Sequence, residues 1–357
     1  MSGEYKGKIM TVLGPIAPGE IGVTQMHEHM IIDFLTVSGS AQQSHQKAFA
    51  GAGGEFGWEE PISLSNYYAV RRNPFLLKEA MQLIDADLIT AAVAEYRQAG
   101  GSCLVEVTPI GVGRNPALLR QISDKTGVKV VMGTAFYVRD FHPPEIAKMD
   151  EQAVADLFVK DFDKGSGSPA VRPGIIGEIG LVWPVHPDER KVLRAAAKAQ
   201  QATGLCLSIH PGRNIAAPFD AIDIVKSAGG DPKRTIICHL DRTIFKIEDY
   251  FALAKTGCYL ELDLFGWETR HYPLSDIDMP NDATRVDNVV QLVKAGHIAQ
   301  ILLSHDVDSK LRLRAYGGEG YQHILEHVVP VMRRKGLSDG QVSQILIENP
   351  RRALTIA

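Results

Sequence analysis

The chain has 357 residues, 45% of them hydrophobic and 22% charged, with a formal net charge of -4 at pH 7. This balance excludes a disordered chain, and the small net charge argues against nucleic acid as a partner. No apolar run has the length of a signal-peptide core near the start or of a membrane span later, so we expect a cytoplasmic protein without a membrane partner. The cysteines lie singly, without C-x-x-C pairs, which predicts reduced thiols at Cys103, Cys206, Cys238 and Cys258.

Short β-rich runs alternate with helical segments along the whole chain. The eight candidate strands are apolar on both faces, as expected for strands buried between a core and a layer of helices, and they cover residues 22–25, 102–108, 129–134, 174–179, 205–209, 234–238, 258–264 and 300–304. The alternation predicts an α/β fold, a (β/α)8 TIM barrel, with residues 1–357 forming a single domain. An open doubly wound sheet is the alternative, although no G-x-G-x-x-G follows the first strand.

Helical spacing of apolar residues is clear in residues 86–99 and 189–201, and Gly100, Gly101 and Gly204 are expected helix stops. Two segments are too long for simple turns. Residues 31–74 follow the first strand and contain a Gly/Ala-rich tract, and residues 265–282 follow the seventh. We expect both to be long rim loops at the C-terminal end of the barrel, the first of them a lid.

The stretch T-Q-M-H-E-H-M places His27 and His29 on the same side of an extended segment, where both could reach one metal ion. Taken alone, His-x-His fits a polar loop equally well. A barrel, however, collects functional groups at the C-terminal ends of its strands. The predicted strands four, five, six and eight end in further residues of ligand type, namely Glu178, His210, His239 and Asp306.

Six such residues suit two divalent ions that share a bridging carboxylate. We assign one ion to His27, His29 and Asp306, and the other to His210 and His239, with Glu178 as the bridge. A hydroxide between the ions is the expected nucleophile, and Asp306 passes its proton to the leaving group. Strand alternation turns Glu28 away from the two histidines, which indicates an orienting or structural group.

At these residues the sequence resembles the phosphotriesterase family of the amidohydrolase superfamily, and within it the phosphotriesterase-related branch. The resemblance runs through H-E-H, G-I-I-G-E-I-G, I-H-P-G-R, H-L-D-R-T, G-C-Y-L-E-L-D-L-F-G and I-L-I-E-N-P-R, in the family's order. It implies a (β/α)8 barrel with a binuclear centre, usually zinc, and hydrolytic chemistry. The phosphotriesterases that name the family bridge their metals with a carboxylated lysine, whereas here Glu178 occupies that position. Phosphotriester hydrolysis therefore does not follow from the family name.

The branch implies an amidase for small N-acyl amino acids or amines such as N-acetyltaurine. The substrate's anion requires a cation near the mouth, and the candidates are Arg213, Arg242, Lys310, Arg312 and Arg314. Tyr137 is expected to donate to the scissile carbonyl. A lactonase, carboxylesterase or phosphotriesterase on the same centre is the alternative, and a non-catalytic ligand-binding protein on a degenerate barrel is the alternative of another class. The sequence leaves a homodimer open.

Overall fold

The computed structural model describes residues 2–36, 56–268, 272 and 274–357. One sheet of eight strands has the order β12-β11-β10-β9-β8-β7-β6-β3, with parallel neighbours throughout. The strands are β3 (Thr24–Glu28), β6 (Cys103–Glu106), β7 (Lys129–Thr134), β8 (Ile175–Gly180), β9 (Cys206–His210), β10 (Thr235–Ile237), β11 (Tyr259–Leu262) and β12 (Ile301–Leu303). Spatial order follows chain order without reversal, so the barrel is confirmed and the doubly wound sheet is excluded.

The first and last strands of the sheet meet through hydrogen bonds beyond the regular ladder. The backbone N–H of His27 in β3 donates to Oγ of Ser304 at 2.9 Å, directly after β12. The N–H of Asp306 donates to the carbonyl oxygen of His27 at 3.2 Å. These bonds bring the ends of β3 and β12 side by side, so the first and last strands of the sheet are joined as in a barrel.

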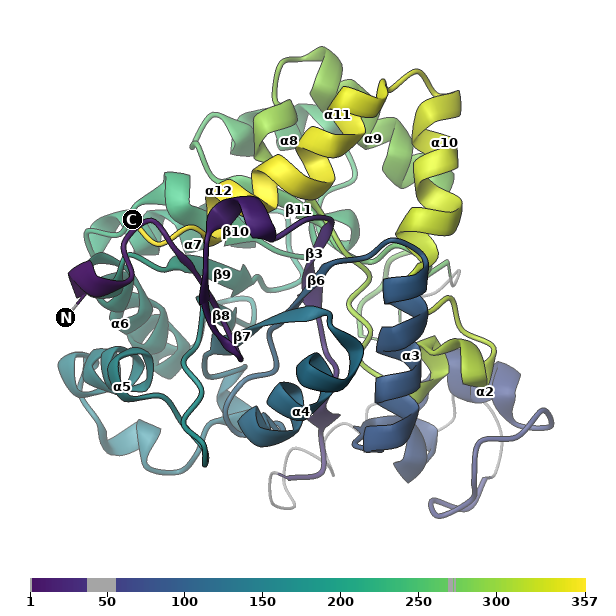
Figure 1. Cartoon of the computed structure of the whole chain (residues 1–357), viewed down its shortest axis with the longest axis horizontal. Coiled ribbons are helices and arrows are strands. Elements are labelled where there is room, and N and C mark those ends of the chain that lie inside the picture. The colour runs from purple at the N-terminus through teal and green to yellow at the C-terminus, as the bar shows by residue number, and fades with distance from the viewer. Residues whose placement is uncertain (1, 37–55, 269–271, 273) are drawn as a thin grey trace.

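Helices cover the outside of the sheet (Figure 1). They are α3 (Ala86–Gln98), α4 (Pro116–Thr126), α5 (Glu151–Lys164), α6 (Pro187–Thr203), α7 (Ala217–Ser227), α8 (Ile247–Ala254) and α9 (Asp282–Lys294), followed by α10 (Val329–Arg334), α11 (Asp339–Ser343) and α12 (Asn349–Leu354). The predicted stop after α6 is confirmed, since Gly204 caps the helix with φ 75°, a conformation that favours glycine.

The alternation of side chains divides the core into an inner and an outer layer. Cys103 and Val105 of β6 belong to a cluster with residues from the other strands, whereas Leu104 packs with side chains of α3 and α4. The four cysteines are buried and free, as the sequence predicts. Both faces of the strands are therefore buried, which explains their continuous apolar character.

A short hairpin that the sequence analysis did not predict precedes the barrel. Its strands are β1 (Ile9–Thr11) and β2 (Gly14–Ile16), and the N–H of Val12 in its turn donates to the carbonyl of Val130 in β7 at 2.8 Å. The end of the chain packs beside it, because the N–H of Ile356 donates to the carbonyl of Lys8 at 2.9 Å. The two termini therefore lie on the same side of the molecule (Figure 1).

The described part of the long segment after β3 forms short elements. In it, β4 (Ile32–Asp33) pairs antiparallel with β5 (Gln82–Leu83), and α2 (Tyr67–Arg72) lies between them in the chain. Most of the Gly/Ala-rich tract, and with it the predicted lid, lies outside the described residues. Among the described residues, no helix combines the length and the apolar character needed to cross a membrane.

Candidate metal centre

The structure brings the six predicted ligands together at the C-terminal ends of their strands. His27 and Glu178 lie in β3 and β8, and His210 is the last residue of β9. The other three lie one to three residues beyond the ends of β3, β10 and β12, and they are His29, His239 and Asp306. The five residues other than Asp306 are each at most 6% exposed, and the Asp306 side chain is 14% exposed.

Glu178 lies at the middle of the cluster. Its carboxylate is 3.6 Å from Nε2 of His27, 3.4 Å from Nε2 of His29, 2.9 Å from Nδ1 of His210 and 3.4 Å from Nε2 of His239. One carboxylate thus faces a ring nitrogen from each of four histidines, which lie at the ends of three different strands, β3, β9 and β10.

Asp306 lies on the side of the cluster formed by β3. Its Oδ1 is 3.2 Å from Nε2 of His29 and 3.6 Å from Nε2 of His27. Asp306 has φ 55° and His239 has φ 52°, a left-handed conformation that residues other than glycine rarely adopt and that is enriched at functional sites. The loop geometry that presents these two side chains is therefore held by the surrounding structure.

The donor atoms form two triads of His and Glu that share Glu178. One contains His27 and His29, the other His210 and His239, and within each triad the atoms lie within 4.8 Å of one another. A further group joins Asp306 to His27 and His239, so it crosses the division between two ions that the sequence analysis assigns, and that division stays a prediction.

The donor set fits a divalent cation. Both ring nitrogens of His27 are buried without a hydrogen-bond partner among the described residues, at a cost of about 1–3 kcal/mol for each unsatisfied group. Nε2 of the same ring points toward the carboxylates of Glu178 and Asp306. Imidazole nitrogen with carboxylate oxygen is a ligand combination that zinc and its first-row neighbours accept.

The electrostatics of the cluster also favour a positive charge. Burial by itself lowers the pKa of the His27 imidazole, but the charges of Glu178 and Asp263 outweigh burial and raise this pKa to about 10. Burial opposes ionisation of Glu178 in turn, yet His27 and His210 hold the pKa of this carboxyl well below its ordinary value. The carboxylates therefore create a field in which a proton or a metal cation is stabilised.

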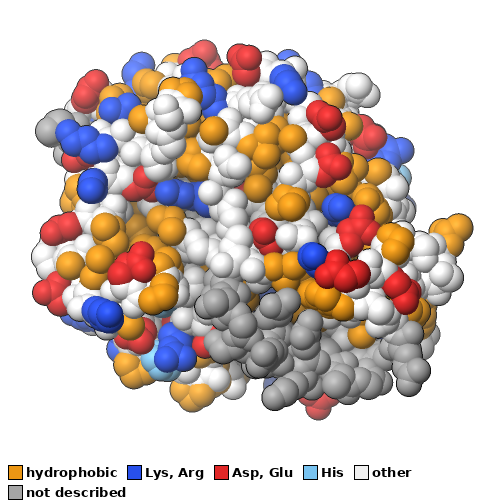
Figure 2. Space-filling model, turned by 90° about the horizontal axis from the view of Figure 1, so that it is seen from below, with side chains coloured by type: hydrophobic (Ala, Val, Ile, Leu, Met, Phe, Trp, Pro, Cys, Tyr) orange, Lys and Arg blue, Asp and Glu red, His pale blue; other side chains and the backbone are white. Residues whose placement is uncertain are grey.

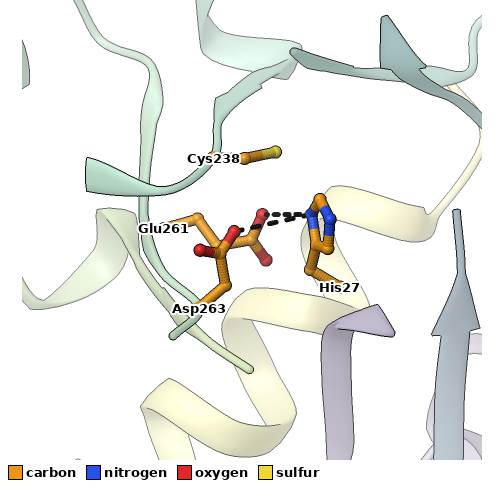
Figure 3. A group of neighbouring side chains, drawn as sticks. All are labelled: His27, Cys238, Glu261 and Asp263. Carbon is orange, nitrogen blue, oxygen red and sulfur yellow. Dashed lines mark ion pairs between the residues drawn. The ribbon is translucent and has the colours of Figure 1, made fainter. Parts of the chain in front are cut away.

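A second layer of polar residues lies behind the ligands, and the sequence analysis assigned it no role. Nδ1 of His239 lies 2.9 Å from Oδ1 of Asp263, and Nδ1 of His29 lies 2.8 Å from Oγ1 of Thr108. Glu261 and Asp263 face Nδ1 of His27 (Figure 3). The motif L-E-L-D-L contains Glu261 and Asp263, and it could have indicated both residues. Acidic side chains at alternate positions of an apolar strand point to the same buried face, where they need partners.

Glu28 is an orienting group, as the sequence analysis predicts. Its fully buried carboxylate accepts the backbone N–H of His305 at 2.9 Å and of Val307 at 3.0 Å, the two neighbours of Asp306. It also accepts the hydroxyl of Ser304 at 2.7 Å and lies 2.9 Å from Nδ1 of His305. Glu28 therefore holds the backbone on both sides of Asp306.

A cavity that opens to solvent and has an empty volume of about 1040 Å³, open solvent included, lies over the cluster. His210, His239 and Asp306 contribute to its floor, and its described walls include the apolar side chains of Phe34, Pro74, Met81, Phe141 and Leu274. A cavity of this size at the C-terminal end of a barrel is the usual position of a substrate site.

Two of the predicted substrate-binding cations line this cavity. Arg213 lies over the ring of Tyr272 at 5.4 Å and donates to its hydroxyl at 3.1 Å, and buried Arg242 contacts Nε2 of His210 at 3.1 Å. Among the described residues, neither guanidinium has a carboxylate within ion-pair distance. Tyr137 also lines the cavity, with its ring 5.0 Å from that of His210.

The remaining predicted cations lie elsewhere. Lys310 donates to Glu79 at 2.9 Å and does not line the cavity, so the structure does not bring it to the cluster. Arg312 donates to the backbone carbonyls of Phe265 and His305, and half-exposed Arg314 lies near Glu326. On the face shown in Figure 2, the coloured Lys, Arg, Asp and Glu side chains are interspersed, without a large region of one sign.

Fold and site together define a (β/α)8 barrel whose mouth carries a buried cluster of histidines and carboxylates of the kind that can hold a metal ion. The profile of the phosphotriesterase family matches residues 7–354, and the chain belongs to this family. It is 41% identical to an N-acetyltaurine hydrolase of Tetraodon nigroviridis and 40% identical to that of Homo sapiens, each over 98% of both chains.

Solved structures agree with the fold. A crystal structure of a resiniferatoxin-binding protein from Rhodobacter sphaeroides is 35% identical, with a TM-score of 0.89 over 98% of this chain and 96% of the other. A lactonase from Listeria monocytogenes has a TM-score of 0.78 at 22% identity, over 98% of this chain and 99% of the other, which is a likeness of fold alone.

Proposed function

We propose that this protein is a binuclear, zinc-dependent hydrolase of N-acyl amines that carry an anionic group, with N-acetyltaurine as the reference substrate. The observation that carries the proposal is the pair of His-His-Glu groups that share Glu178. The names of relatives at about 40% identity support the substrate. The guanidinium groups of Arg213 and Arg242 line the cavity without a carboxylate at ion-pair distance among the described residues, which supports an anionic substrate.

The ligands named above would hold two divalent cations, one with His27, His29 and Asp306, the other with His210 and His239, and Glu178 between them. Such cations supply Lewis acidity toward water and toward the acyl carbonyl. Amide hydrolysis adds water across the C–N bond, and one proton of the water must reach the departing nitrogen. Asp306 reaches into the cavity and is the group that accepts this proton and donates it to the amine.

The other cavity residues bind and orient the substrate. Arg213 and Arg242 pair with its sulfonate or carboxylate, and the hydroxyl of Tyr137 donates to the carbonyl oxygen. Tyr137 keeps its proton at neutral pH, because burial and then the charge of Glu178 raise its pKa well above the ordinary value. A glutamate bridge also makes carboxylation of a lysine unnecessary.

The test is a substrate panel with zinc-reconstituted protein, containing N-acetyltaurine, N-acyl amino acids, lactones, carboxylesters and aryl phosphotriesters. We expect amide cleavage to have the highest kcat/KM and Asp306→Asn to abolish it. Turnover of lactones without amide cleavage would instead support the lactonase alternative, for which the apolar walls at Phe34 and Phe141 are suited. Binding of panel compounds without any turnover would support a ligand-binding protein.

The metal part of the proposal is tested separately by metal analysis. Wild-type protein is expected to hold two zinc ions per chain, and Glu178→Ala fewer. If Glu178→Ala retained two ions and full activity, Glu178 would not be the bridge.

A further inference from the structure

Strand β11 supplies none of the proposed ligands, yet it brings two carboxylates to the cluster. Glu261 lies in β11 and Asp263 follows its end, and both are fully buried. Positions i and i+2 of a strand point to the same face, so both side chains enter the barrel beside His27 (Figure 3). Cys238 completes this group of neighbouring side chains.

The two carboxylates differ in their partners. Asp263 accepts the backbone N–H of His239 at 3.0 Å with both of its oxygens and lies 2.9 Å from Nδ1 of the same histidine. Both oxygens of Glu261, by contrast, are buried without a hydrogen-bond partner among the described residues. The basic atom at ion-pair distance from Glu261 is Nδ1 of His27, at 3.7 Å.

A buried carboxylate without a hydrogen-bond partner destabilises a fold, and retaining one requires a compensating interaction. His27 has the complementary need, since Nδ1 and Nε2 are both without a partner among the described residues. If the ring hydrogen lies on Nδ1, it faces the carboxylates of Glu261 and Asp263. The lone pair of Nε2 then faces Glu178 and Asp306, where the cation would lie.

We propose that Glu261 is a positioning residue for metal binding: when a cation takes the place of the proton on Nε2 of His27, Glu261 holds the remaining ring hydrogen on Nδ1, so that Nε2 is the ligand atom. Its negative charge beneath the cluster strengthens the attraction for the cation as well. Carboxylates behind metal-binding histidines fix the tautomer and orientation of the ring in this way. The inference rests on the proposed metal centre, but not on the proposed substrate.

The test uses the metal-free full chain and Zn²⁺ alone as the probe. Glu261→Gln removes the charge at nearly constant shape, and its amide can place a donor against Nδ1. We expect a Zn²⁺ affinity 10–100-fold lower than that of wild type, measured by competition with a chromophoric chelator. The thermal unfolding temperature of the metal-free variant should not fall, because the substitution removes a buried charge that accepts no hydrogen bond among the described residues.

The matched control is Asp161→Asn. It removes a carboxylate that pairs with Arg114 at 2.7 Å, and neither residue is a proposed ligand. This control should lower the unfolding temperature and leave the Zn²⁺ affinity unchanged. The visible spectrum of the Co²⁺-loaded protein should change in Glu261→Gln and not in Asp161→Asn, because only Glu261 faces a proposed ligand.

Several results would overturn the inference. An unchanged Zn²⁺ affinity in Glu261→Gln would contradict only the role of Glu261 and would leave the proposed function intact. A lower unfolding temperature of the metal-free variant with an unchanged Co²⁺ spectrum would show a structural role only. A third zinc ion that is bound by wild type and lost in Glu261→Gln would make Glu261 a ligand. Wild-type protein that binds no zinc would contradict both the metal centre and this inference.

Discussion

Glu28→Gln should lower both the stability of the protein and its catalytic rate. The carboxylate of Glu28 accepts the hydroxyl of Ser304 and the N–H of His305 on Oε1 and the N–H of Val307 on Oε2, at 2.7, 2.9 and 3.0 Å. A glutamine can keep its oxygen on the side of Oε1, but its NH2 group then meets the N–H of Val307, and that donor stays buried without an acceptor.

The magnitude follows from these contacts. A hydrogen bond to a charged group contributes about 1.5–3 kcal/mol, and the Val307 bond is lost. The bonds to Oε1 weaken when the acceptor becomes neutral, while the lower desolvation cost of an amide offsets part of this loss. We expect the free energy of unfolding to fall by about 2–4 kcal/mol. A displacement of Asp306 by about 1 Å would lower kcat about 100-fold.

Urea unfolding, metal content and steady-state kinetics of Glu28→Gln measure these effects. The matched control is Glu189→Gln, because Glu189 is an equally buried glutamate that accepts the backbone N–H groups of Arg139 and Val182, each at 2.8 Å. The control should lose a similar amount of stability and keep its metal content. If Glu28→Gln lost stability to the same extent but kept the wild-type kcat, the reasoning about Asp306 would be refuted.

Three further predictions concern the ions, the substrate anion and acid stability. Removal of the metal with a chelator should abolish activity and lower the unfolding temperature, and zinc should restore both. The reason is that a bound ion stabilises the folded protein by about 4 kcal/mol when the free ion concentration is about 1000 times its Kd. An unchanged unfolding temperature would contradict the metal centre. Arg213→Met and Arg242→Met should each raise KM for N-acetyltaurine but not for a neutral N-acetyl amine. The control Lys310→Met should leave both KM values unchanged. Equal effects of the arginine substitutions on the two substrates would exclude anion recognition by these residues. Burial opposes ionisation of Asp282, but its hydrogen bond to His323 and other contacts hold its pKa below the ordinary value. The ionised carboxylate therefore stabilises the fold above about pH 4, and this contribution is lost as the pH falls through the folded-state pKa. Asp282→Asn should therefore unfold more readily than wild type in urea at pH 7 and much less distinctly so at pH 3, and a constant difference would contradict this assignment.

Much of the fold could be predicted from local pattern, because strand alternation and helix stops depend on residues that are near one another in the sequence. The eight strands and the helices at residues 86–99 and 189–201 were predicted in this way, although the first strand runs Thr24–Glu28 and not 22–25. The hairpin of β1 and β2 was missed, since strands of three residues carry too little pattern. Its turn is joined to β7 by the hydrogen bond from Val12 to Val130, which are far apart in the chain.

The sequence by itself determined which residue types could form the site. Parallel strands end at one edge of a barrel, so the positions of His27, Glu178 and Asp306 at strand ends were sufficient to predict that they meet. Only the tertiary structure decided how each is supported and which cation lines the cavity. It placed Glu261 behind His27 and paired Lys310 with Glu79, whereas Arg213 remained at the cavity. These pairings join residues that are distant in the chain, and such distances are set by packing, which no local pattern encodes.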